Sequence, residues 1–266
     1  MRMTAVLAFL CALVLPAAAA GPEASLSSRC MAIAQALPGV VLAAYTPAQA
    51  QEGPVRITYA GHSTYVIETP AGVRIATDFN GYNGASRLPR VVTMNKAHSS
   101  HYTDSPDPAI EHVLRGWNPE GGPARHLLRV DDVLIRNVPT DIRTWNGMEA
   151  DGNSIFVFEV AGLCIGHLGH LHHDLTDAHY AAIGRLDIVM VPIDGGMTQS
   201  LANMSEIATR LFSSIVLPMH RHATPLGEFL GRMGERFAVE FSSDRSFEVS
   251  LRTLPRQPTI LVLAGI

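Results

Sequence analysis

The chain has 266 residues and a formal net charge of −4, and 47% of its residues are hydrophobic while 17% are charged. Average proteins are roughly 25% charged, so this composition excludes an extensively disordered chain. No run of lysine and arginine is present, which argues against a nucleic-acid partner or an anionic membrane surface. The unusual count is histidine, with 12 residues that fall mainly in three short clusters.

The first residues, Met1–Ala20, are typical of a secretory signal peptide. Arg2 supplies the positive start, an apolar stretch follows, and three alanines precede an expected cleavage near Gly21. The apolar stretch is too short for a membrane span of about 20 residues, so we expect no membrane attachment after cleavage. The sequence therefore predicts a periplasmic or secreted protein, with a leader segment at residues 21–54 and a single domain at residues 55–266.

Two cysteines, Cys30 and Cys164, remain after this cleavage. An oxidising compartment permits a disulfide between them. No feature of the sequence places them close together, however, and Cys164 lies in an apolar strand. The sequence favours two buried free thiols, with a disulfide as the alternative.

Runs of apolar and β-branched residues predict strands, and apolar residues at three- and four-residue spacing predict helices. The predicted strands are Arg56–Ala60, Thr64–Glu68, Val73–Thr77, Arg90–Met94, Asp132–Val138, Ser154–Val160, Leu163–His167, Asp187–Pro192 and Ile215–Pro218. The predicted helices are Ser28–Leu37 in the leader and then Asp174–Ile183, Met204–Phe212 and Thr224–Arg236, with Asp177 and Ser205 as helix-starting residues. Leading strands followed by alternating strands and helices predict a mixed α/β layer protein.

Each histidine cluster follows a predicted strand. The clusters occupy residues 96–101, 167–173 and 220–222. Loops at one edge of a sheet can aim their side chains at a common point. Neutral imidazole is a common zinc ligand, and a catalytic site needs about three protein ligands and one open position. The clusters therefore predict a shared metal site, with surface or supporting positions for His172, His173 and His222.

The order of several motifs resembles the metallo-β-lactamase fold, most closely the branch similar to L-ascorbate-6-phosphate lactonase. The motifs are Gly61-His62-Ser63-Thr64, Asp78, residues 96–101, Gly152-Asn153-Ser154-Ile155, His167-Leu168-Gly169-His170, Gly195-Gly196 and Pro218-Met219-His220. The resemblance implies a four-layer αββα sandwich that holds one or two metal ions between loops at one edge.

The resemblance also implies which residues bind the metal. In the family motif His-x-His-x-Asp-His, Lys96 and Ser100 replace the first His and the Asp, and His170 stands where a bridging Asp is usual. The implied ligands are His98, His101, His167, His170 and His220. Neutral imidazole cannot replace the charge that a bridging carboxylate brings to two cations, and Lys96 would repel a metal. We therefore expect one ion, zinc foremost, with manganese or iron as alternatives, held best by the last His of the motif together with His170 and His220.

The implied function is an exported metal-dependent hydrolase of an ester, lactone, amide or phosphodiester, acting on a small molecule through a metal-bound water. His62 or Asp78 would substitute for the motif Asp, and Lys96 would stabilise an oxyanion or bind an anionic substrate. Structural hydrogen bonding is the alternative role for the first two, and a solvated loop charge for the third. Because acidic ligands are lost, the main alternative function is a non-catalytic metal- or ligand-binding protein that retains the fold. An iron-dependent oxidoreductase is a third possibility, and the sequence shows neither the substrate nor the oligomeric state.

Overall fold

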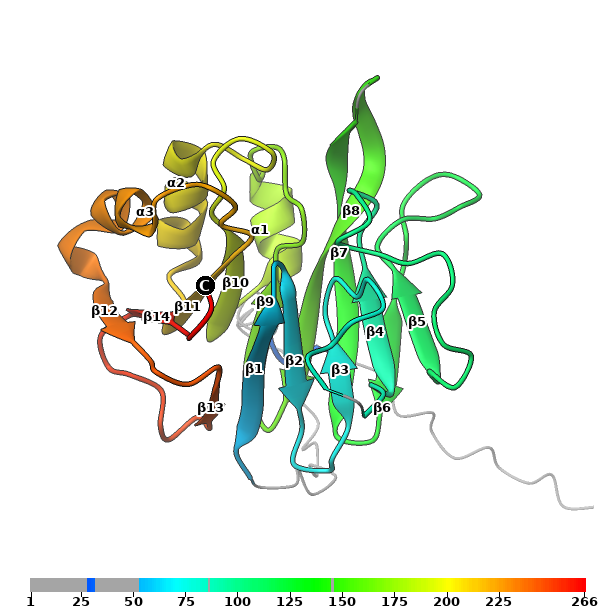
Figure 1. Cartoon of the computed structure of the whole chain (residues 1–266), viewed down its shortest axis with the longest axis horizontal. Coiled ribbons are helices and arrows are strands. Elements are labelled where there is room, and N and C mark those ends of the chain that lie inside the picture. The colour runs from blue at the N-terminus through cyan, green and yellow to red at the C-terminus, as the bar shows by residue number, and fades with distance from the viewer. Residues whose placement is uncertain (1–27, 32–52, 86, 145) are drawn as a thin grey trace, which may run out of the picture.

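The computed structural model describes residues 28–31, 53–85, 87–144 and 146–266, in which two β-sheets pack face to face (Figure 1). The predicted signal peptide, most of the leader and most of the predicted helix at residues 28–37 lie outside the described residues. Among the helices that the structure describes, none combines the length and apolarity needed to cross a bilayer.

The first sheet has six strands in the order β13-β1-β2-β3-β4-β5. These are β1 (Val55–Gly61), β2 (Thr64–Glu68), β3 (Arg74–Ala76), β4 (Val91–Met94), β5 (His112–Arg115) and β13 (Ser246–Val249). Strands β1 to β3 form an antiparallel meander, and β4 and β5 continue parallel to β3. Alternate side chains point to opposite faces of a strand, so Tyr65 and Ile67 enter the core between the sheets while Val66 faces outward.

The second sheet has eight strands in the order β12-β14-β11-β10-β9-β8-β7-β6. These are β6 (Leu127–Val130), β7 (Val133–Thr144), β8 (Gly147–Val160), β9 (Leu163–His167), β10 (Ile188–Pro192), β11 (Ile215–Met219), β12 (Ala238–Phe241) and β14 (Thr259–Val262). Strands β9, β10, β11 and β14 run parallel. The β7–β8 hairpin is longer than the strands around it and projects beyond them at one edge (Figure 1).

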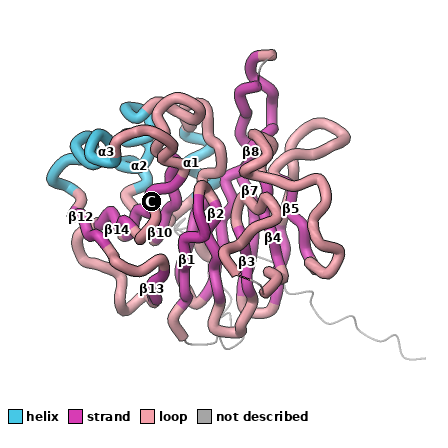
Figure 2. Tube along the Cα trace, viewed as in Figure 1, coloured by secondary structure: helices cyan, strands magenta, loops and turns pink. Residues whose placement is uncertain are grey.

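The described helices all follow β9 in the chain and cover the outer face of the eight-stranded sheet (Figure 2). They are α1 (Asp177–Ile183), α2 (Leu201–Leu211), α3 (Leu226–Met233) and the 3-10 turn η2 (Gly234–Arg236). The Thr176 and Ser200 hydroxyls cap α1 and α2, so the predicted helix start at Asp177 is confirmed and the one at Ser205 was wrong. Asp177 is the first residue of α1, and Ser205 lies inside α2, where its hydroxyl donates to the Leu201 carbonyl.

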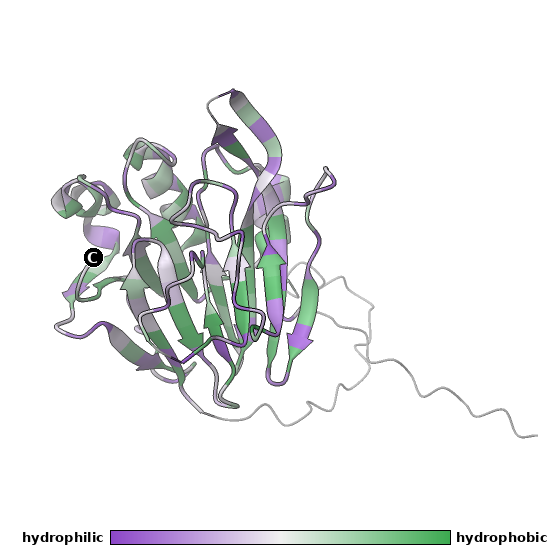
Figure 3. Cartoon of the chain, turned by 45° about the vertical axis from the view of Figure 1, so that its right-hand side comes forward, coloured by the Kyte–Doolittle hydropathy of each residue, from purple (hydrophilic) through white to green (hydrophobic). Residues whose placement is uncertain are grey.

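Three apolar cores hold these layers together, and hydrophobic residues run along the strands of both sheets (Figure 3). The largest lies between the sheets, and the second lies between the eight-stranded sheet and the helices. The third lies on the outer face of the six-stranded sheet, where Phe79, Ile110, Tyr102 and Trp117 cover it. The predicted α/β sandwich is confirmed. Within the described residues, its fourth layer consists of loops, since these four side chains occupy the place expected of helices.

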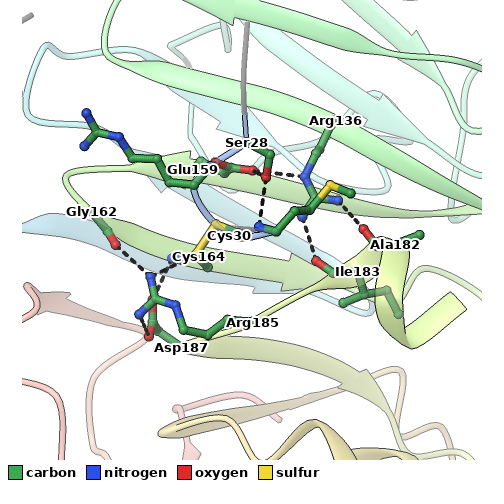
Figure 4. The surroundings of a disulfide bond; sticks show 12 residues. Ser28, Cys30, Arg136, Glu159, Gly162, Cys164, Ala182, Ile183, Arg185 and Asp187 are labelled. Atoms are coloured by element: carbon green, nitrogen blue, oxygen red, sulfur yellow. Dashed lines mark hydrogen bonds and ion pairs between the residues drawn. A yellow bond between two sulfur atoms is a disulfide. The ribbon is translucent and has the colours of Figure 1, made fainter. Parts of the chain in front are cut away.

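The preference for two free thiols was wrong, because Cys30 and Cys164 form a disulfide with a Cα–Cα distance of 5.9 Å (Figure 4). Cys164 faces the helical layer, and the segment at residues 28–31 lies against that same face. The Ser28 hydroxyl and the Arg29 amide both donate to the Glu159 carboxylate, which fixes the segment beside the bond. The two cysteines are 134 residues apart, so no local pattern could indicate the contact.

Replacing both Cys30 and Cys164 with alanine should lower the free energy of unfolding by about 2–4 kcal/mol, because the bond closes a long loop in the unfolded chain. For a chain of this size the melting temperature should fall by roughly 4–16 °C. Thermal unfolding followed by circular dichroism measures the change, and reduced wild-type protein is the matched control that should melt with the variant. A double variant that melts within about 1 °C of the oxidised wild type would contradict a stabilising role.

Candidate metal centre

Five histidines gather at one edge of the sandwich, between the two sheets. His62 lies in the β1–β2 turn, His98 and His101 follow β4, His170 follows β9, and His220 follows β11. The ring centroids lie 4.2 Å apart for His62 and His220, 4.6 Å for His101 and His170, and 4.9 Å for His101 and His220. Side chains from four separate loops therefore converge on one point: the three loops that carry the histidine clusters and the β1–β2 turn.

Four of these rings present a buried nitrogen that has no hydrogen-bond partner in the described part of the chain. The atoms are the Nε2 atoms of His62, His101, His170 and His220. Buried polar atoms are nearly always satisfied, so four such atoms in one place call for a ligand. One ring nitrogen each from His62, His98, His101 and His220 lie within 4.8 Å of one another. This donor set fits a cation that binds imidazole.

Two buried carboxylates support the cluster from behind. Asp78 Oδ2 lies 2.6 Å from His101 Nδ1, and Asp194 Oδ1 lies 3.0 Å from His220 Nδ1. An imidazole that donates its Nδ1 proton to a carboxylate keeps Nε2 as a free donor atom for a metal. Asp78 also accepts from the Asn95 side chain, and Asp194 accepts from the amides of residues 196–198. The orientation of both rings is therefore fixed before any metal binds.

Three rings of the cluster, those of His62, His98 and His170, are kept neutral. Burial, together with the nearby histidines, lowers the pKa of His62 to about 3 and the pKa of His98 to about 4. Burial is also the main cause of the lowered pKa of His170. For Asp78, burial alone would raise the pKa, but His167, His101 and Asn95 hold it below its usual value. Neutral rings beside ionised carboxylates are the protonation states that a divalent cation needs.

Three site residues adopt left-handed backbone conformations although none is glycine. The φ angles are 53° at His62, 41° at Asp78 and 50° at His220. Such conformations are uncommon and persist where the surroundings enforce them. Here the His220 amide donates to the His62 carbonyl at 2.8 Å, and this bond joins the two sheets directly at the site.

The loop that carries His170 requires a glycine beside it. Gly169 has a φ of 61°, and a Cβ atom there would lie 2.4 Å from Asn95 Nδ2 and 2.5 Å from Asn153 Oδ1. The same Asn153 oxygen accepts the His170 amide at 2.8 Å. This close packing sets the position from which His170 enters the cluster.

The structure places two predicted site residues, His167 and Lys96, outside the cluster. Both ring nitrogens of His167 are engaged, since Nε2 donates to the Ser63 carbonyl at 2.8 Å and Nδ1 accepts the Gly169 amide at 3.1 Å. His167 therefore supports the turn that carries His62 and has no free nitrogen for a metal. Lys96 forms an exposed ion pair with Glu149 at 2.5 Å. His62 and Asp78, predicted as catalytic, are respectively a member of the cluster and the partner of His101.

Sequence reasoning missed two residues that organise the site. Asn95 directly follows β4, and its side chain links Asp78 to the Ser154 amide of the other sheet. Asp194 follows β10 and precedes the Gly195-Gly196 pair. A polar residue just past a buried strand was the signal used for histidine, and the same signal applied to Asn and Asp would have found both.

The fold and this edge site are those of a metallo-hydrolase scaffold. Residues 56–220 match the family described as the beta-lactamase superfamily domain, so the chain belongs to the metallo-β-lactamase superfamily. A metal-dependent hydrolase from Pyrococcus furiosus is 24% identical over 198 residues, which cover 64% of this chain and 86% of that protein. The resemblance to the L-ascorbate-6-phosphate lactonase branch stays a prediction.

Solved structures share the architecture. A protein from Thermotoga maritima, described as a zinc-dependent hydrolase of the metallo-β-lactamase superfamily, matches with a TM-score of 0.57 and 24% identity over 79% of this chain and 98% of its own. The metallo-β-lactamase fold protein YhfI from Bacillus subtilis matches with a TM-score of 0.53 and 10% identity over 80% of this chain and 99% of its own. These similarities establish the fold.

Proposed function

We propose that the protein is an exported metal-dependent hydrolase that cleaves an ester, lactone, amide or phosphodiester bond in a small molecule, with one zinc ion at the histidine cluster. The observation that carries this proposal is the convergence of four buried, unpartnered imidazole nitrogens at one edge of the sandwich. The superfamily relatives named as metal-dependent hydrolases support the reaction class. Imidazole ligands suit zinc and iron, whereas manganese prefers carboxylate oxygens.

A bound divalent cation supplies an activated water near neutral pH and polarises the bond to be cleaved. In the chain itself, His101 and His220 are the central donors, because both rings are fully buried and each is held by a buried carboxylate. Asp78 and Asp194 act as positioning residues, since each fixes the ring that it contacts. Both oxygens of Asp78 are already engaged and the residue is fully buried, so it orients His101 and has no free oxygen for a substrate.

Export is supported by the disulfide as well as by the predicted signal peptide. Stable disulfides are a feature of secreted and periplasmic proteins and are rare in a reducing cytosol. The Cys30–Cys164 bond has both cysteines buried, which suits a permanent structural bond. We therefore propose a periplasmic or secreted location.

The test is metal analysis of the purified mature protein, followed by turnover of a nitrophenyl ester, a lactone, an anilide and a bis-nitrophenyl phosphodiester with and without chelator. We expect about one zinc per chain, turnover of at least one substrate, loss of turnover with chelator, and recovery when zinc is restored. Bound metal without turnover on any of these substrates would favour the non-catalytic binding protein. A mature protein that neither contains nor takes up metal would overturn the proposed hydrolase and would leave only a ligand-binding protein as the alternative.

A further inference from the structure

We infer that His62 is a direct metal ligand, so that the cation site consists of His62, His98, His101 and His220 and contains no charged ligand. This inference deepens the function proposed above and rests on it. It differs from the expectation that the ligands come from the segments after β4, β9 and β11 alone, with His62 as a proton acceptor.

The positions of the unpartnered nitrogens are the first argument that His62 is a metal ligand. Its Nε2 is buried and unpartnered, and one nitrogen of its ring belongs to the group of four ring nitrogens that lie within 4.8 Å of one another. Bonds of about 2.0–2.1 Å from zinc to nitrogen allow two ligands to lie up to about 4.2 Å apart. A small inward movement of the rings therefore completes the site. His170 is not in this group of four, although its ring lies 4.6 Å from that of His101 and 4.9 Å from that of His220.

The turn that carries His62 is held by its backbone, which leaves the ring free. The His62 carbonyl accepts the His220 amide at 2.8 Å and the Tyr59 hydroxyl at 3.2 Å. The next residue, Ser63, accepts the His167 ring at its carbonyl and contacts His101 Nδ1 with its hydroxyl. The backbone of His62 is therefore held in a left-handed conformation while its ring Nε2 stays unpartnered. This arrangement presents the nitrogen to a ligand.

The charges behind the ligands explain how four neutral imidazoles can hold a dication. Asp78 and Asp194 have side-chain exposures of 0% and 2%, and each contacts the far nitrogen of one proposed ligand. Two buried negative charges require compensation inside the protein. A divalent cation provides equal and opposite charge through His101 and His220. The carboxylates therefore act through the imidazoles that they contact, whereas in sites with oxygen ligands carboxylates bind the metal directly.

A site of this composition has a predictable metal preference. Imidazole donors without carboxylates favour zinc, cobalt, nickel and copper, whereas magnesium and manganese prefer oxygen ligands. We therefore expect the mature protein to bind zinc and cobalt and to retain neither manganese nor magnesium through a desalting column.

The experiment compares zinc affinity, measured by chelator competition, for the wild type, His62→Asn and His222→Asn. Asparagine tolerates the left-handed conformation, and within the described part of the chain the hydrogen bonds of His62 all use its backbone, so the turn is kept. His222 is the matched control because it is also a left-handed histidine, with a φ of 50°, and it is exposed. We expect His62→Asn to bind zinc at least about 100-fold more weakly, a larger loss than removal of a supporting partner causes. The control should change less than about threefold. A loss smaller than about 100-fold for His62→Asn, or an equal loss in the control, would overturn the assignment.

A second measurement on wild-type protein does not depend on how the variant folds. Histidine ring ¹⁵N resonances, recorded before and after addition of zinc, report which nitrogens bind it. We expect the His62 Nε2 resonance to shift as a metal-bound nitrogen, and an unshifted His62 resonance in zinc-loaded protein would overturn the inference. Wild-type protein that takes up no zinc would instead defeat the proposed function, so the two failures are distinguishable.

Discussion

Replacing His101 or His220 with alanine should strip most of the metal from the protein and reduce hydrolysis by at least about a thousandfold. Each change removes one of about three or four ligands and also leaves a buried carboxylate, Asp78 or Asp194, without its partner. The contribution of a catalytic cation is several kcal/mol, and each 1.36 kcal/mol is a factor of ten in rate. Metal per chain, measured by atomic emission, and kcat/KM on the best substrate together report both effects.

The control for these variants is His112→Ala, on β5, whose ring contacts Glu111 and lies outside the cluster. It should retain full metal content and turnover. If both cluster variants kept a full metal complement, the five-histidine cluster would not be the metal site, whatever their activity. Loss of metal with intact apo-protein folding is the expected pattern.

Arg136→Met should lower the free energy of unfolding by about 3–5 kcal/mol, because it breaks a buried ion pair and leaves one charge behind. Arg136 donates to Glu159 Oε1 at 2.9 Å and to the carbonyls of Ala182 and Ile183 at 2.7 Å and 2.6 Å (Figure 4). The guanidinium thus joins β7 and β8 to the end of α1. Glu159 also holds the segment beside Cys30, so its orphaned charge would weaken that attachment too.

The matched control is Arg56→Met, at a pair on the protein surface. Arg56 and Glu248 are 50% and 56% exposed and lie 3.2 Å apart. Exposed pairs contribute about 0–1 kcal/mol, so this variant should unfold near the wild-type denaturant midpoint. Equal midpoints for the two variants in denaturant unfolding of oxidised protein would contradict the buried-pair argument.

The buried strands were predictable because their sequences carry the apolar signal itself. Thr64–Glu68 and Leu163–His167 agree with β2 and β9 residue for residue. The outer half of the β7–β8 hairpin was missed, since it is only partly buried and contains Pro139 and Gly152, which are typical of strand ends. The short edge strand β12 also lacks an apolar pattern, because three of its four residues are exposed.

The location of the site was predictable in the same way, but its detailed membership was not. Histidines after buried strands marked the edge of the sandwich at which the structure brings their rings together. Whether a histidine faces the centre depends on the partner that each ring nitrogen finds across the sheets. His167 is satisfied by Ser63, whereas the neighbouring His62 is not satisfied, and no sequence pattern distinguishes them. The prediction for the two cysteines was wrong for the same reason, because Cys30 and Cys164 come into contact only when the layers pack.

The site draws its proposed ligands from both halves of the sandwich. The six-stranded sheet supplies His62, His98 and His101 through its loops, and the eight-stranded sheet supplies His220. A cation bound there would have ligands from both sheets, so it would be held only while the two sheets are packed together. Separation of the sheets and release of the ion would then occur together, so every protein molecule that carries the ion also has its two sheets packed.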